Sequence, residues 1–118
     1  MANPIMNRIG TVFIPVSDIE KARQWYCQLL GTPVSGDIQY GHLYVVPMAG
    51  ETGLVLDSKI YDKDQQGKAP LFHFNAADIE AAYQYVKELG AAMLSGIEHD
   101  HWFTFEDPDG NVLMVCKC

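Results

Sequence analysis

Residues 18–31 of the chain read DIEKARQWYCQLLG, and residues 78–90 read DIEAAYQYVKELG. Both stretches begin with Asp-Ile-Glu and end with Leu-Gly, and one residue has been gained or lost between the two copies. Their apolar residues recur on one helical face. Ser17 or Asp18, and then Asp78, stand where a helix N-cap is expected, and a glycine stands where a left-handed C-cap is expected. We therefore expect an amphipathic helix in each stretch, over 21–30 and over 81–89.

The repeat extends into the sequences around the two helices. An apolar, partly β-branched run precedes each helix, at Ile9–Val16 (IGTVFIPV) and at Pro70–Ala76 (PLFHFNA), and has the pattern of a half-buried strand. Asp107–Asn111 (DPDGN) is a turn sequence that predicts a hairpin between the last two strands. Three short strand-like runs follow each helix. They are 33–36, 39–47 and 53–58 in the first half, and 92–95, 102–106 and 112–116 in the second.

Each half of the chain therefore predicts one β-α-β-β-β module, and the fold class is α+β. A chain of 118 residues suits a single domain, which we place over 1–118. Module one covers about 8–58 and module two about 70–116, joined by the polar, glycine-containing linker 59–69.

Composition excludes several classes of partner. The formal charge is −7, from 15 acidic and 8 basic residues, which argues against nucleic acid or an anionic membrane surface as the main partner. The chain shows no secretory signal and no apolar run long enough to span a bilayer, and its three cysteines do not form a disulfide pattern. We expect a cytoplasmic protein with reduced thiols. Cys116 and Cys118 could bind a soft metal as a CxC pair, but a last strand with a fraying tail is favoured.

Several motifs resemble one known family, the vicinal-oxygen-chelate superfamily of glyoxalase I, extradiol dioxygenases, fosfomycin-resistance transferases and bleomycin-resistance proteins. The resemblance covers roughly Arg8 to Cys116, and the order of its motifs is specific for the fold and not for one reaction. The matching motifs are Val16–Ala22 (VSDIEKA), Trp25-Tyr26, Leu29–Gly31, Phe74, Asp78, Leu89-Gly90 and Phe105–Asn111 (FEDPDGN).

The resemblance implies that two βαβββ modules curl a mixed sheet around a cavity, as in the glyoxalase/bleomycin-resistance fold. Relatives often form this cavity through a dimer, and a two-fold homodimer would cover the open sheet edges. In the enzymes of the family the cavity holds a divalent metal, bound by His and Glu side chains and open to substrate oxygens.

The positions of the family's metal ligands carry other residues in this chain. Three of them fall on Thr11, Leu71 and Met114, and the fourth falls within Gly53–Asp57, where only Asp57 is not Gly or aliphatic. Leucine has no donor atom, and a thioether prefers soft metals. The mapping therefore predicts no metal site, no metal cofactor and no metal-dependent glyoxalase I activity.

The cavity itself is expected to remain and to bind a small molecule. Trp102 could stack on a flat or cationic ligand or could pack in the core, and His73 could act as acid or base or could be an ordinary core histidine. His42 shares a strand face with Tyr40 and Tyr44, and that face could line the cavity or the outer surface. The predicted cavity residues are Thr11, Phe13, His42, Leu71, His73, Trp102, Thr104 and Met114.

Two function hypotheses follow from this pattern. The first is a metal-independent binding protein of the bleomycin-resistance type, with a hydrophobic, planar or cationic ligand. The second is an enzyme of the family, either metal-free with His73 as the acid or base, or with a displaced metal bound by His73, His42 or His101. His99 and His101 form a His-x-His pair that could bind a metal but is more typical of a solvated strand start.

Overall fold

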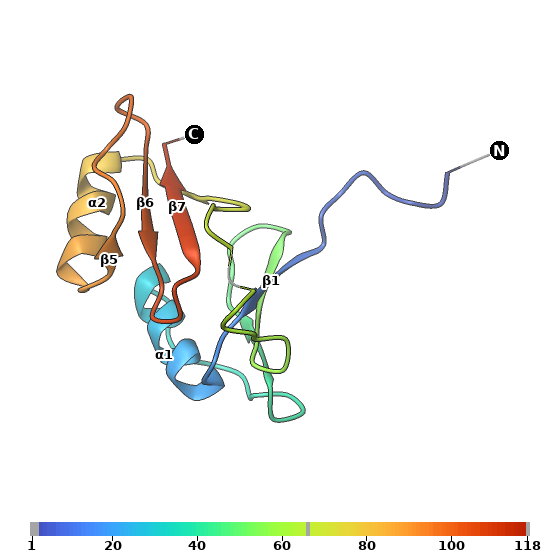
Figure 1. Cartoon of the computed structure of the whole chain (residues 1–118). Helices are drawn as coiled ribbons and strands as arrows, with labels where there is room; N and C mark the ends of the chain where they lie inside the picture. Colours follow the sequence, from blue (N-terminus) through green and yellow to red (C-terminus); the bar gives the residue numbers. More distant parts are fainter. Residues whose placement is uncertain (1–2, 66, 118) are drawn as a thin grey trace. The chain divides into compact units, whose positions relative to one another are not determined.

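Two helices, each preceded and followed by strands, make up the computed structural model, which describes residues 3–65 and 67–117 (Figure 1). The chain divides into two units at Ile60–Tyr61, inside the predicted linker. The first unit contains β1 (Thr11–Pro15), α1 (Ile19–Leu30), β2 (Leu43–Val46) and β3 (Gly53–Asp57). The second contains β4 (Phe74–Asn75), α2 (Ile79–Glu88), β5 (Ala92–Met93), β6 (Trp102–Glu106) and β7 (Val112–Cys116).

The first unit is a three-stranded sheet with α1 on one face. Its strand order is β1-β3-β2, with β1 parallel and β2 antiparallel to β3. Alternate side chains of each strand face the helix and are buried, and α1 contributes its own apolar side to the same core. This core contains Ile14, Ala22, Tyr26, Leu29, Tyr44, Val46, Leu54 and Leu56.

The second unit repeats this arrangement with α2. Its strand order is β4-β7-β6-β5, and β4 is parallel to β7, as β1 is to β3. The ring of Tyr83 on α2 lies 5.2 Å from that of Phe103 on β6, so the fully buried Phe103 and Phe105 face the helix. The α+β class predicted from the sequence is therefore confirmed. The second unit has the predicted βαβββ order, whereas the first has one strand fewer.

The predicted aspartate N-caps, the glycine cap of α1 and the last hairpin are confirmed. Both helices begin two residues before the predicted ranges, and α2 ends at Glu88 with Leu89 as a right-handed C-cap. Asp18 and Asp78 are the N-caps, and Gly31 ends α1 with a φ of 65° that favours glycine. The hairpin turn between β6 and β7 is held by the buried carboxylate of Asp107, whose Oδ1 accepts hydrogen bonds of 2.9 Å from the backbone N–H groups of Asp109 and Asn111.

Several strand predictions were wrong or too long, among them 92–95, of which only Ala92 and Met93 form a strand. The run 33–36 is not a strand, because Ser35 and Gly36 bond through their carbonyl oxygens to the side chains of Tyr44 and Arg23 instead of to a neighbouring strand. The strand predicted over 39–47 is confined to β2, because 39–42 forms a turn. The strand predicted over 70–76 pairs only at Phe74 and Asn75.

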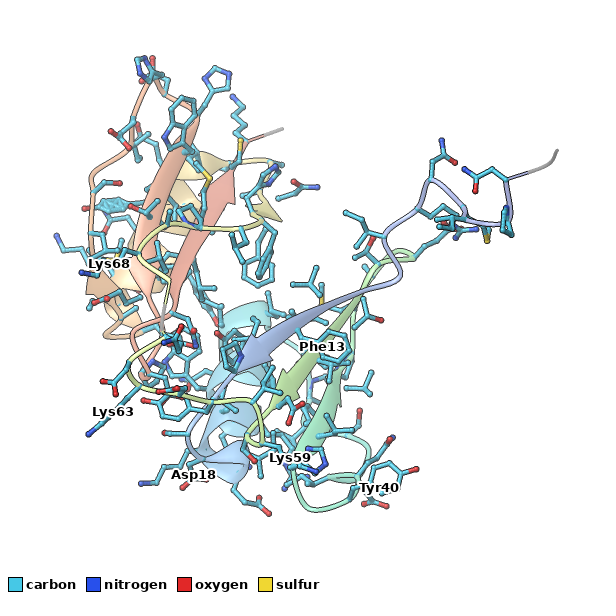
Figure 2. The ribbon with its side chains drawn as sticks, turned by 45° about the vertical axis from the view of Figure 1, so that its right-hand side comes forward. Phe13, Asp18, Tyr40, Lys59, Lys63 and Lys68 are labelled. Atoms are coloured by element: carbon cyan, nitrogen blue, oxygen red, sulfur yellow. The ribbon has the colours of Figure 1, made fainter. Side chains whose placement is uncertain are left out.

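The turn at 39–42 also overturns the expectation that Tyr40, His42 and Tyr44 share a face. Tyr44 faces α1 and is 1% exposed, whereas Tyr40 has a φ of 54° and is 86% exposed on the turn (Figure 2). Within the described residues, neither helix is long and apolar enough to cross a membrane. Cys27 and Cys116 are buried, and Cys118 lies outside the described residues.

Candidate functional site

The first sheet has an apolar face that points away from α1, which we call the first open face. Phe13 of β1, Val55 of β3 and Val45 of β2 are register partners and form one row across its three strands. Phe13 is 58% exposed and Val45 is 50% exposed, and Phe13 stands on the strands of the sheet (Figure 2). Thr11, the next residue of β1 on this face, is exposed as well. A flat apolar molecule could cover this row and remove its surface from water.

A polar pair lies at one end of the first open face. Asp57 is a register partner of Pro15 and Leu43, so its side chain belongs to the row next to that of Phe13. Its Oδ1 lies 2.8 Å from Nδ1 of His42 and accepts a 2.9 Å hydrogen bond from the backbone N–H of Lys59. The side chains of His42 and Asp57 are 27% and 10% exposed, so a mostly buried carboxylate holds a partly accessible imidazole.

These contacts keep Asp57 ionised. Burial alone would raise the pKa of the Asp57 carboxyl, but the hydrogen bonds from His42 and from the Lys59 N–H outweigh it and place the pKa below its ordinary value. A carboxylate can only accept hydrogen bonds, so Nδ1 of His42 is the donor in this pair. The neutral imidazole then has its acceptor at Nε2.

The turn before β2 puts His42 beside Asp57. The carbonyl oxygen of Gln39 accepts hydrogen bonds from the N–H groups of His42 and Leu43, and Tyr40 and Gly41 between them both have positive φ. Sequence reasoning selected His42 but missed its partner. One feature of the sequence could have indicated this partner: Asp57 is the only ionisable residue of β3, and it ends an otherwise apolar strand.

The second sheet also has a face that points away from its helix, which we call the second open face. Trp102 and Thr104 alternate with the buried Phe103 and Phe105, and Thr104 is the register partner of Met114. The described side chains of Trp102, Thr104 and Met114 are all partly exposed. Three of the predicted cavity residues therefore share one face of this unit.

Two hydrogen-bonded groups order the rim of the second open face. Trp102 donates from Nε1 to Oε2 of Glu98 at 3.2 Å, and its ring lies 5.0 Å from that of His99. Ser95 Oγ accepts hydrogen bonds from both the backbone N–H and the hydroxyl of Thr104, at 3.0 and 3.3 Å. Trp102 thus presents an oriented ring with one polar edge already bonded.

The remaining predicted residues lie ahead of β4. Leu71 is 96% exposed, and His73 is exposed with Nδ1 3.4 Å from the carbonyl oxygen of Phe74. The predicted cavity residues therefore divide between the units, with Thr11, Phe13 and His42 in the first and Leu71, His73, Trp102, Thr104 and Met114 in the second.

The residues at the family's metal positions do not fit a divalent metal. Thr11 offers a hydroxyl, Leu71 offers no donor and Met114 offers a thioether, a set without the imidazole and carboxylate ligands that such a metal needs. Among residues 3–65 and 67–117, no three His, Cys, Asp or Glu side chains are grouped so that they could hold a metal ion. His99 and His101 share a turn, where His101 Nδ1 lies 2.6 Å from the His99 carbonyl oxygen.

The comparison with known proteins identifies the family. A family model of the Glyoxalase/Bleomycin resistance protein/Dioxygenase superfamily matches residues 8–115. The chain belongs to this superfamily. The resemblance predicted from its motifs is thereby confirmed.

Three similar proteins align with almost the whole length of this chain. The uncharacterized protein YetH of Bacillus subtilis (strain 168) is 30% identical in an alignment of 118 positions that covers 94% of this chain and 98% of YetH. TnmS3, an antibiotic binding protein from Streptomyces sp. CB03234, is 24% identical with a TM-score of 0.75 and 98% coverage of both chains. A glyoxalase/bleomycin resistance protein from the same organism is 25% identical with a TM-score of 0.70, covering 93% of this chain and all of its own.

Proposed function

We propose that this superfamily member binds a small, planar and largely apolar molecule without using a metal. The observation that carries the proposal is the row of Phe13, Val55 and Val45 on the first open face. Aromatic and aliphatic side chains that are in register across three strands make a flat surface, which suits a flat ligand.

The second open face supports the same function. Trp102 offers a large ring for stacking, and Thr104 on the same face supplies a hydroxyl across the sheet register from Met114. A few polar groups within an apolar surface are typical of small-molecule sites, where they fix the orientation of the ligand.

Relatives and charge narrow the class of ligand. TnmS3 has the same fold and is described as an antibiotic binding protein, so this fold can accommodate an organic small molecule. The net charge of −7 would attract a cationic ligand more strongly than an anionic one.

A thermal-shift screen of planar aromatic compounds, neutral and cationic, tests the proposal, because a ligand of the folded state raises the unfolding midpoint. The shift should be lost in Phe13→Ala and kept in Tyr85→Ala, since Tyr85 is a comparably exposed aromatic residue on α2. A screen in which no compound raises the midpoint, or a shift that survives Phe13→Ala, would contradict it.

Metal analysis of the purified protein separates this function from a metal enzyme with a displaced site. We expect no stoichiometric zinc, nickel, iron or manganese. A stoichiometric metal that is lost in His73→Ala, His42→Ala or His101→Ala would overturn the proposal and favour the enzyme.

We infer in addition that the protein forms a homodimer in the cytoplasm. β1 and β2 are the two edge strands of the first sheet, and such edges are commonly covered by a second chain. The buried free thiol of Cys27 suits a reducing compartment. Light scattering after size exclusion tests the dimer, and a monomeric mass at micromolar concentration would refute it.

A further inference from the structure

We propose that His42 accepts a hydrogen bond at Nε2 from an aromatic hydroxyl group of the ligand. This inference rests on the proposed function, because it assigns the polar contact of a planar molecule lying on the first open face. The ligand class is thereby narrowed to fused aromatic compounds that carry a hydroxyl at their edge.

The direction of the hydrogen bond follows from the contacts of the imidazole. Nδ1 is 2.8 Å from the Asp57 carboxylate and must donate to it. When the ring carries no second proton, its other nitrogen can only accept. Asp57 is in turn fixed by the backbone N–H of Lys59. The pair therefore presents an oriented acceptor, and no described residue bonds to Nε2 of His42.

The position of the pair sets the size of the ligand. Asp57 lies two residues beyond Val55 along β3, and two residues of a strand span roughly 6.6 Å. A molecule with one ring over Phe13 and Val55 reaches the imidazole with a group on its second ring. Two fused rings with a hydroxyl on the far ring match this distance.

The same geometry disfavours other substituents. A methyl ether at this position has no proton to donate, and a carboxylate would meet both the Nε2 lone pair and the negative charge of Asp57. Because one hydrogen bond contributes about 0.5–1.5 kcal/mol net, the hydroxyl compound should bind roughly three- to tenfold more tightly than its methyl ether.

Equilibrium dialysis with 2-naphthol and 2-methoxynaphthalene tests the inference on the full chain. The wild type should bind 2-naphthol roughly three- to tenfold more tightly. His42→Asn should remove this preference, because the asparagine amide can still donate to Asp57 but lacks an acceptor at the Nε2 position. Phe13→Ala should weaken both compounds alike.

The outcomes distinguish the two proposals. Equal binding of the two compounds to the wild type, or a preference that survives in His42→Asn, would overturn the role of His42 and leave the binding function standing. If neither compound binds, or Phe13→Ala changes neither affinity, both proposals fall. The circular dichroism spectrum of His42→Asn, compared with that of the wild type, checks that the variant is folded.

Discussion

Asp18 and Asp78 make the same hydrogen bond in the two modules. Oδ1 of Asp18 accepts from the backbone N–H of Lys21 at 3.1 Å, and Oδ1 of Asp78 accepts from that of Ala81 at 3.0 Å. Both residues have extended backbone angles and directly precede the first turn of their helix. The repeated Asp-Ile-Glu of the sequence is therefore a repeated helix start.

Removing either cap should destabilise the protein. Asp18→Ala and Asp78→Ala should each lower the free energy of unfolding by about 1 kcal/mol, because a backbone N–H of the first turn loses its acceptor. Urea unfolding followed by circular dichroism measures the change. Asp→Ser at each site should restore most of it, and Asp37→Ala, an exposed aspartate outside both helices, serves as control. Equal stability of Asp18→Ala, Asp78→Ala and the control would contradict the capping role.

The Tyr44 hydroxyl should stabilise the segment after α1. It donates a 2.7 Å hydrogen bond to the carbonyl oxygen of Ser35, and its ring is 1% exposed. Tyr44→Phe leaves that carbonyl without this donor and should lower the free energy of unfolding by about 1–2 kcal/mol. Tyr40→Phe, on the exposed turn, should have no measurable effect in the same urea titration. The prediction fails if the two variants unfold at the same urea concentration.

Acid should lower the free energy of unfolding of the first unit, because Asp57 becomes protonated. The pKa of this carboxyl is lower in the folded chain than in the unfolded chain, so the unfolded chain takes up the proton first as the pH falls. Stability from this group is complete well above the ordinary pKa of 3.8 and is lost as the pH drops through the lower folded value. We expect the free energy of unfolding to begin to fall at about pH 4 and to keep falling at lower pH.

The matched variant Asp57→Asn isolates this carboxyl. At pH 7 the substitution should lower the free energy of unfolding by about 1–2 kcal/mol, because the charged hydrogen bonds to His42 and Lys59 are lost. The decrease should be smaller at pH 3. Urea titrations of both proteins across this range give the difference. If the gap between wild type and variant is the same at every pH, another group is responsible.

Trp102 should report on ligands of the second open face. A compound from the thermal-shift screen that stacks on this ring should quench tryptophan fluorescence. The quenching should disappear in Trp102→Phe and persist in Trp25→Phe, because Trp25 lies on α1, with its ring 4.9 Å from that of Tyr26. Quenching that depends on Trp25 instead would argue against this face as a binding surface.

Much of the fold could be predicted from local sequence. The repeated caps predicted both helix starts, and period-two alternation gave the bounds of β6 and β7 as the structure has them. The run 33–36 was misjudged because its conformation depends on distant side chains, notably the Tyr44 hydroxyl. Such contacts leave no local pattern in a short apolar run.

The site was less predictable than the fold. Alternation along β1 and β6 identified Phe13 and Trp102 as residues that face away from the helices. Alternation gave a wrong prediction around His42. The positive φ of Tyr40 interrupts the strand there, so side chains before and after it no longer alternate between two faces. The pairing of His42 with Asp57 joins a turn to a strand end far along the chain, and one sequence alone does not encode such a contact locally.

The parallel pairing of β1 with β3 has a consequence for synthesis on the ribosome. β1 is the first strand of its unit to emerge, yet its partner in the described sheet is β3, the last. The helix and β2 are therefore made before β1 has a neighbour, and the same holds for β4 and β7. The sheet of each half should therefore not fold until its final strand leaves the exit tunnel, and it should then fold in a single cooperative step.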